Sequence, residues 1–270
     1  MIALLIAAVV IFAAFLLLAF FVAPRAKYSN IENLLGTDIF AHRGLFKNTA
    51  VPENSFSAFE AAVNRGYGIE LDVHISSDGV PIVIHDSSLK RICGMDEMVE
   101  NLPLCDIKLL NLFGGNETVP TLHEVLKLVS GAVPLIIEIK TYKGNYKKVC
   151  RAVCDLLSEY SGKYSIESFD PLVLIWFRRH KMDVVRGILA PGAPENSGKL
   201  LSVALMHGAV LLLNFLTKPD FIAFDHRFKN LFLFRFIRFV FHVTAALWTI
   251  KGLKSANELT QKYDAAIFEE

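Results

Sequence analysis

Short apolar runs with the character of β-strands alternate with longer, helix-like stretches from residue 38 onwards. The predicted strands are 38–41, 68–73, 133–140, 164–167, 184–189, 221–225, 243–250 and 265–268. Eight strand–helix units predict an α/β fold, the (β/α)₈ TIM barrel, which typically needs roughly 250 residues. A doubly wound sheet would alternate in the same way. However, the glycine-rich phosphate loop expected after its first strand is missing from the sequence.

In a (β/α)₈ barrel the functional side chains lie at the carboxyl ends of the strands. The predicted strand ends supply His42 and Arg43, then Glu70 and Asp72, then Glu138 and Lys140, and finally Trp248. Glu70 and Asp72 lie two residues apart, so they share one face of their strand. The same spacing places Glu138 and Lys140 on one face of the next strand. We therefore expect a charged cluster at one rim of the barrel.

The residues after the second strand predict a hairpin that returns to this rim. Asp78-Gly79 is a strong signal for a two-residue turn between two apolar runs. Pairing around such a turn places Asp72 directly opposite His85, and opposed side chains share a face of the sheet. The sequence thus predicts that His85 joins the carboxylates.

The expected cluster combines groups with complementary chemistry. The carboxylates of Glu70, Asp72 and Glu138 form an oxygen-rich set that suits a hard divalent cation such as Mg²⁺ or Ca²⁺. His42 and His85 can serve as general acid and general base. The two basic side chains at the same strand ends suit a phosphate anion. Together these groups favour metal-assisted cleavage of a phosphodiester.

Eight short motifs follow one another along the chain. They are His42-Arg43-Gly44, Pro52-Glu53-Asn54-Ser55, Glu70-Leu71-Asp72-Val73, Asp78-Gly79, His85-Asp86, Pro120-Thr121-Leu122, Glu138-Ile139-Lys140 and Trp248-Thr249. In order and spacing they resemble the glycerophosphodiester phosphodiesterases, a (β/α)₈-barrel family, in a bacterial, membrane-anchored form. The resemblance covers about residues 39–268. It implies hydrolysis of a glycerophosphodiester to sn-glycerol 3-phosphate and an alcohol, through a cyclic phosphate formed by the substrate's own hydroxyl.

The resemblance also implies roles for individual residues. The implied metal ligands are Glu70, Asp72 and Glu138, the implied acid/base pair is His42 and His85, and the implied substrate or phosphate contacts are Arg43, Lys140 and Trp248. We expect Glu53 and Asp86 to orient these groups. A small insertion is implied at about residues 87–119, after the His-Asp motif. Which histidine acts first as the base stays open.

Two segments depart from the family pattern. Trp248-Thr249 is followed by Ile250-Lys251, where family members often carry Val-Asn. The last strand ends in Phe268-Glu269-Glu270 instead of a Thr-Asp-x-Pro-like turn. We therefore expect different contacts at this part of the rim.

An uninterrupted apolar run occupies residues 2–23 and is long enough to span a bilayer. It lacks the basic start and the cleavage site of a signal peptide, which is the alternative. We therefore expect a single-pass membrane anchor at 1–24, a linker at 25–37 and the barrel at 38–270. Arg25 and Lys27 follow the run and no basic residue precedes it, which places the barrel in the cytoplasm by the positive-inside rule.

Two more apolar segments, 200–216 and 228–241, fit either ordinary barrel helices or helices that lie on a bilayer. They keep open a second enzymatic function, lysophospholipase D-type hydrolysis of membrane lysolipids. A catalytically silent protein that binds phospholipid headgroups is a further alternative. The formal net charge of +1 gives no basic excess, so we expect no nucleic-acid partner. The sequence predicts no oligomeric state.

Overall fold

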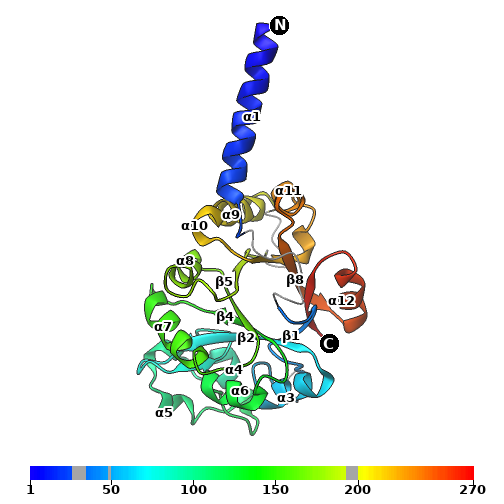
Figure 1. The fold of residues 1–270 in the computed structure, drawn as a ribbon. Coiled ribbons are helices and arrows are strands. Elements are labelled where there is room, and N and C mark those ends of the chain that lie inside the picture. Colours follow the sequence, from blue (N-terminus) through cyan, green and yellow to red (C-terminus); the bar gives the residue numbers. More distant parts are fainter. Residues whose placement is uncertain (26–34, 48–49, 193–199) are drawn as a thin grey trace.

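The computed structural model describes residues 1–25, 35–47, 50–192 and 200–270, except for the side chains of 200–204. Within these ranges eight parallel strands form a barrel: β1 (Ile39–His42), β2 (Gly68–Ile75), β4 (Leu135–Ile139), β5 (Tyr164–Ser168), β6 (Arg186–Leu189), β7 (Phe221–Asp225), β8 (Thr244–Lys251) and β9 (Ala265–Glu269). The ring is closed because β1 pairs with both β2 and β9 (Figure 1). The predicted TIM barrel is confirmed.

Helices cover the outside of the barrel. They are α3 (Phe56–Arg65), α6 (Leu122–Val129), α7 (Tyr146–Leu157), α8 (Pro171–His180), α9 (Leu200–Leu212), α10 (Asn214–Thr217), α11 (Phe232–Phe241) and α12 (Leu253–Thr260). Side-chain caps begin three of them, from Ser55, Thr121 and Asp170. Each such cap stabilises its helix by about 1 kcal/mol. These caps fix where α3, α6 and α8 begin.

Large aromatic rings fill the interior of the barrel near the amino-terminal ends of its strands. Phe40 of β1 and Phe221 of β7 are fully buried there, in a cluster separate from the one beneath the helices. A Cβ atom at Gly187 would lie 2.2 Å from the Phe221 ring, and one at Gly68 would lie 2.5 Å from the Phe40 ring. Glycine is therefore required at both positions. The rings fill this end of the barrel, and the cavity described below lies toward the carboxyl ends of the strands.

The hairpin after β2 forms, but one residue away from the predicted register. β3 (Pro81–Val83) runs antiparallel to β2, and its pairing places Asp72 opposite Ile84. The N–H of Ile84 donates to the carbonyl of Asp72 at 3.1 Å. The predicted pairing of Asp72 with His85 is therefore wrong. His85 follows the end of β3, in an irregular segment that carries it to the rim.

The length of the turn causes this difference. The N–H of Ser76 donates to the carbonyl of Val80 at 2.9 Å, so three residues form the loop instead of two. The last of them, Gly79, has a φ of +94°. A three-residue loop that ends with a residue of positive φ is a common hairpin connection, and it selects glycine at that position.

The residues between β3 and α6 form a small substructure on the rim. It contains α4 (Lys90–Cys93), η1 (Val99–Asn101), α5 (Leu104–Ile107) and η2 (Leu112–Gly114). Their buried side chains pack into a cluster of their own, which includes Ile92, Val99 and Ile82 of β3. This substructure lies within the predicted insertion, whose boundaries at 87 and 119 stay a prediction.

The helix α1 (Ile2–Val22) leaves the barrel beside α9, α10 and α11 (Figure 1). Among the described residues it is the one helix long and apolar enough to cross a membrane. The side chain of Asn214 donates to the carbonyl of Val22 at 3.0 Å, and the N–H of Arg25 donates to that of Pro219 at 2.8 Å. The predicted linker 25–37 falls mostly on 26–34, which lies outside the described residues together with Lys27.

Candidate active site

The carboxyl ends of the barrel strands surround a cavity of about 100 Å³. It is lined by His42, Arg43, Glu70, His85, Glu138, Lys140, Glu167, Phe169, Leu189, Trp248, Thr249 and Ile267. Asp72 lies beside this lining and is paired with Lys140. The fold therefore gathers the predicted histidines, carboxylates, basic side chains and tryptophan around one space.

His42 ends β1, and behind it lies Glu269 of β9. The Nδ1 atom of His42 is 2.7 Å from Oε1 of Glu269. Burial lowers the pKa of His42, and the hydrogen bond to Glu269 opposes that shift only in part. Burial would raise the pKa of Glu269, but His42 and Lys251 lower it to about 2. His42 is therefore uncharged near neutral pH, with its proton on Nδ1 and its Nε2 available to accept another.

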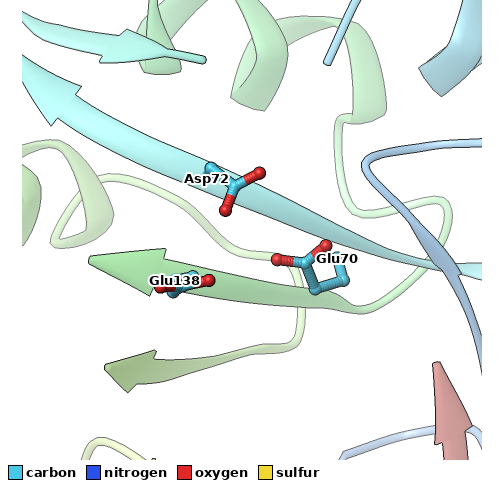
Figure 2. A group of neighbouring side chains, drawn as sticks. All are labelled: Glu70, Asp72 and Glu138. Atoms are coloured by element: carbon cyan, nitrogen blue, oxygen red, sulfur yellow. The ribbon is translucent and has the colours of Figure 1, made fainter. Parts of the chain in front are cut away.

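Three buried carboxylates lie on neighbouring strands, Glu70 and Asp72 on β2 and Glu138 on β4 (Figure 2). One oxygen from each lies within 4.8 Å of the others. Burial and the nearby negative charges raise the pKa of Glu70 well above its usual range. Burial also raises the pKa of Glu138 to about 7, although Lys140 opposes this shift. The group is thus electrostatically strained unless positive charge is added to it.

Lys140 supplies part of that charge. Its Nζ is 3.0 Å from Oδ1 of Asp72 and 2.7 Å from Oε1 of Glu138. Burial would lower the pKa of Lys140, but the two carboxylates raise it. Burial would likewise raise the pKa of Asp72, but Lys140, His85 and Arg43 hold it well below its usual range. Asp72 and Lys140 therefore form a charged pair inside the cluster.

His85 is fixed from two directions. Its Nδ1 lies 2.6 Å from Oδ1 of Asp86, and its backbone carbonyl accepts a hydrogen bond from Nε2 of His74 at 3.1 Å. His74 is itself buried and lies 2.7 Å from Glu100 of the small substructure. The hydrogen bond from His85, helped by Arg91, lowers the pKa of Asp86. These contacts hold both the ring and the backbone of His85.

A chain of ion pairs joins the two histidine-bearing sides of the cavity. Glu53 accepts from Arg43 at 2.8 Å and from Arg91 at 2.7 Å. The Nε of Arg91 also donates to Asp86 at 2.6 Å, and Asp86 holds His85. Glu53 and Asp86, the two predicted orienting residues, thus lie in one network through Arg91.

Aromatic side chains form another part of the wall. The ring of Trp248 lies edge-on to Phe169, with 6.0 Å between centroids. Among the described residues the indole N–H of Trp248 is buried without a hydrogen-bond partner. A second hollow, of about 380 Å³, extends from His85 and Lys140 toward Asp170. The site thus offers room for a group larger than a phosphate.

Residues 42–228 match the model of the glycerophosphoryl diester phosphodiesterase family. The chain belongs to this family. A glycerophosphodiester phosphodiesterase of Caldanaerobacter subterraneus subsp. tengcongensis is 40% identical over 146 residues, which are 50% of this chain and 58% of that protein. Human glycerophosphodiester phosphodiesterase 1 is 30% identical over 162 residues, which are 55% of this chain and 47% of that protein. The chain spans about half the length of the curated relatives it matches.

Solved structures share the barrel. A phosphodiesterase of Oleispira antarctica, solved in complex with the product sn-glycerol-3-phosphate, has a TM-score of 0.72 at 22% identity, covering 89% of this chain and 95% of that one. A glycerophosphodiester phosphodiesterase of Thermotoga maritima has a TM-score of 0.64 at 24% identity, covering 86% and 94%. At these identities the likeness is one of fold.

The match to the family ends at residue 228, before the strand that carries Glu269. The sequence placed Glu269 and Lys251 in the two segments that depart from the family pattern. The structure joins them, because Lys251 pairs with Glu269 behind His42. The two segments that depart from the family pattern thus contact each other next to His42. Sequence spacing alone could not reveal this contact.

Two further residues of this family member were missed. Glu167 of β5 is buried next to Glu138 in the strand register, and within the described chain its Oε2 has no hydrogen-bond partner. Burial and Glu138 raise its pKa well above the usual range. Asn54 donates to Oδ2 of Asp72 at 2.8 Å. Glu167 ends a predicted strand, so the rule that found Glu138 could have found it. Asn54 ends no predicted strand; it stands in the Pro52-Glu53-Asn54-Ser55 motif, but no role was assigned to it there.

Proposed function

We propose that this chain hydrolyses glycerophosphodiesters to sn-glycerol 3-phosphate and an alcohol. The observation that carries the proposal is the rim cavity, where two carboxylate-paired histidines, His42 and His85, face buried carboxylates and cations. Membership of the family supports the same reaction, as do the names of the relatives. The product held by the Oleispira antarctica enzyme is in line with it.

We propose that Glu70, Asp72 and Glu138 hold a divalent cation, Mg²⁺ or Ca²⁺. These cations prefer oxygen ligands, and the three carboxylates are buried and close together. With Glu167 included, the cavity region holds more carboxylates than basic side chains, so a bound cation relieves the repulsion within it. When bound, the cation stabilises negative charge on the non-bridging oxygens of the phosphate.

The two histidines carry the proton transfers. The glycerol hydroxyl of the substrate attacks phosphorus while Nε2 of His42 accepts its proton. The bond from phosphorus to the alcohol oxygen breaks, and that oxygen takes a proton from His85. Water then opens the cyclic phosphate: His85 accepts a proton from the water, and His42 returns its proton to the glycerol oxygen. We assign the first step to His42 because its lowered pKa leaves it unprotonated near neutral pH.

The remaining lining residues position the substrate. Arg43 and Lys140 are held by carboxylates before any phosphate arrives, so little side-chain order is lost on binding. Trp248 offers an apolar surface to the glycerol moiety. The second hollow beyond His85 accommodates the alcohol group.

We further propose that α1 anchors the chain in the cell membrane as a single-pass helix, with the barrel in the cytoplasm. The proposed units are an anchor at 1–24, a linker at 25–37 and the barrel at 38–270 with the insertion at 87–119. The buried contact between Val22 and Asn214 supports retention of α1, since cleavage would expose it. Arg25, just after the helix, agrees with a cytoplasmic side.

The reaction is tested by measuring release of glycerol 3-phosphate by the full-length, detergent-solubilised chain. The substrates are glycerophosphocholine, glycerophosphoethanolamine and glycerophosphoglycerol, each with Mg²⁺ or Ca²⁺, with a chelator, and with the His42→Ala variant. We expect turnover that disappears with the chelator and with the variant. Absence of turnover on all three substrates, with metal still bound, would refute the proposal and favour lysolipids or simple headgroup binding.

The orientation is tested separately by protease digestion of right-side-out vesicles. A barrel in the cytoplasm stays intact until the vesicles are lysed. Digestion in sealed vesicles would instead place it outside.

A further inference from the structure

From residue 205 onwards, where the side chains are described, the outer surface of α9 and α10 is apolar, whereas the outer surface of an ordinary barrel helix is charged. Leu205, Met206, Leu212 and Leu216 are 66, 52, 37 and 41% exposed. The exposed side chains of α7 are Lys147, Lys148, Arg151 and Asp155. Single exposed apolar residues are normal on a protein in water, but a continuous apolar helix face is not. An apolar face of this kind is better suited to a neighbour other than water than to solvent.

The inner side of the same two helices carries polar groups. His207, Asn214 and Thr217 are almost completely buried, and the ring of His207 lies 4.7 Å from that of Phe224. Polar side chains that face the protein, with apolar ones facing outward, are the arrangement of helices in lipid. The polarity of α9 and α10 is thus reversed relative to α7.

The helix α11 continues this surface. Phe232 and Phe239 are 74 and 83% exposed, and with Phe236 they border a groove of about 460 Å³. Arg235 lines the same groove and has no acidic partner among the described residues. Exposed aromatic side chains next to a free cation are typical of a helix at a membrane interface, where the cation meets lipid phosphate.

The helix α1 fixes how deep this surface would lie. The rings of Phe15 and Phe236 are 5.6 Å apart, and those of Phe21 and Phe215 are 5.0 Å apart. Phe15 precedes Val22 by roughly 10 Å along the helix axis, at about 1.5 Å per residue. A face buried about 5–10 Å into the headgroup and acyl boundary is usual for interfacial helices. A bilayer spanned by α1 would therefore also reach α11.

We propose that the lipid-facing surface, formed by Leu205, Met206, Leu212, Leu216, Phe232 and Phe239, is immersed in the interfacial layer of a phospholipid bilayer. The inference rests on the proposed anchoring by α1 and deepens it. Continuity with α1 selects a bilayer over a protein partner, and Arg235 suits its phosphate groups. The barrel then lies on the membrane in one fixed orientation instead of hanging from a tether.

The test uses the full-length chain in vesicles of phosphatidylcholine and phosphatidylglycerol, with lipids brominated near the start of their acyl chains. Phe239→Trp places a fluorescent probe on the lipid-facing surface, and Leu212→Trp places a second one on α9. Leu109→Trp is the matched control, because Leu109 is 79% exposed and closely follows α5 in sequence. The helix α5 lies at the opposite end of the molecule from α1 (Figure 1). We expect bromine to quench the first two probes several-fold more strongly than the control.

The outcomes separate the inference from the proposals beneath it. Equal quenching of all three probes in protein that floats with the vesicles overturns the lipid-facing surface and keeps the anchor. Protein that does not float overturns the anchor and the inference together. Turnover of glycerophosphocholine in the same samples reports on the proposed reaction independently of either result.

Discussion

In most soluble proteins charged side chains lie outside and apolar side chains lie inside. Two regions of this barrel depart from that distribution in opposite ways, the rim and the helices α9 and α10. At the rim, charged groups such as Glu70 and Asp72 are buried. On α9 and α10, apolar groups such as Leu205 are exposed, whereas α7 presents charged residues to water. Buried charge needs a compensating ion, and exposed apolar surface needs a neighbour other than water. This contrast underlies the two proposals made above, a cation at the rim and a lipid bilayer against the outer face.

The largest expected effect comes from removing a rim histidine. His42→Ala and His85→Ala should each lower kcat by roughly 10²–10⁴-fold, because each removes one proton transfer. Turnover of glycerophosphocholine measures this. His123→Ala, which alters an exposed histidine on α6, is the control. A comparable loss of kcat in that variant would contradict a specific role for the rim histidines in proton transfer.

Neutralising the group behind His42 should have a smaller effect. Glu269→Gln keeps a hydrogen-bond acceptor but removes the charge, and we expect activity to fall roughly 10–100-fold. Because Glu269 raises the pKa of His42, its loss lowers that pKa further. The acid limb of the kcat/KM profile should therefore move to lower pH. An unmoved limb, with activity retained, would contradict the pairing.

Much of the rim was predictable because its motifs end consecutive strands, where strand parity fixes which way a side chain points. Glu70, Asp72 and Glu138 follow from that rule. Glu269 does not, because its partner His42 is 227 residues away. The hairpin register was missed because the turn at Gly79 has one more residue than the dipeptide signal predicts.

The apolar face should respond to charge only when lipid is present. In vesicles, we expect trypsin to cut the double variant Phe232→Asp/Phe239→Asp after Arg235 roughly fivefold faster than the wild type. Placing a carboxylate in lipid costs free energy, so the variant helix should leave the bilayer and become accessible to the protease. Cleavage after Arg151 on α7 is the internal reference, and Leu109→Asp is the matched variant. The quantity compared is the rate of cleavage after Arg235 divided by the rate after Arg151. If this ratio were the same in the double variant, the matched variant and the wild type, α11 would not differ from α7 in its contact with lipid.

The sequence alone could not predict which side chains of α9, α10 and α11 face outward. Segments 200–216 and 228–241 are apolar enough to suit either a barrel or a bilayer. Which residues point outward depends on how each helix packs on the strands. Only the packing of α10 on the barrel, which buries Asn214 and exposes Leu216, reveals the reversal.

The smallest expected effect is a pH dependence of stability in the presence of a chelator. Between pH 4.5 and about 7 the folded chain keeps Glu138 protonated while the unfolded chain does not. The folded state therefore binds more protons, and stability falls as pH rises. The raised pKa values of Glu70 and Glu167 act in the same direction, and the lowered one of His42 opposes them.

Thermal unfolding measures this, with an expected decrease in Tm of a few degrees across that range. Added Ca²⁺ should make Tm depend less on pH, because the cation replaces the protons on the buried carboxylates. A Tm that rises with pH in chelator would show that the buried carboxylates are not strained.

The contact between His42 and Glu269 joins the first barrel strand to the last. Contacts between residues so distant in sequence form late and slowly during folding. A chain that has assembled β1 to β8 but has not docked β9 holds most of the cavity wall, yet its His42 has no carboxylate behind it. We expect full turnover only once the ring has closed, so the rate at which activity appears during refolding should report the last stage of assembly.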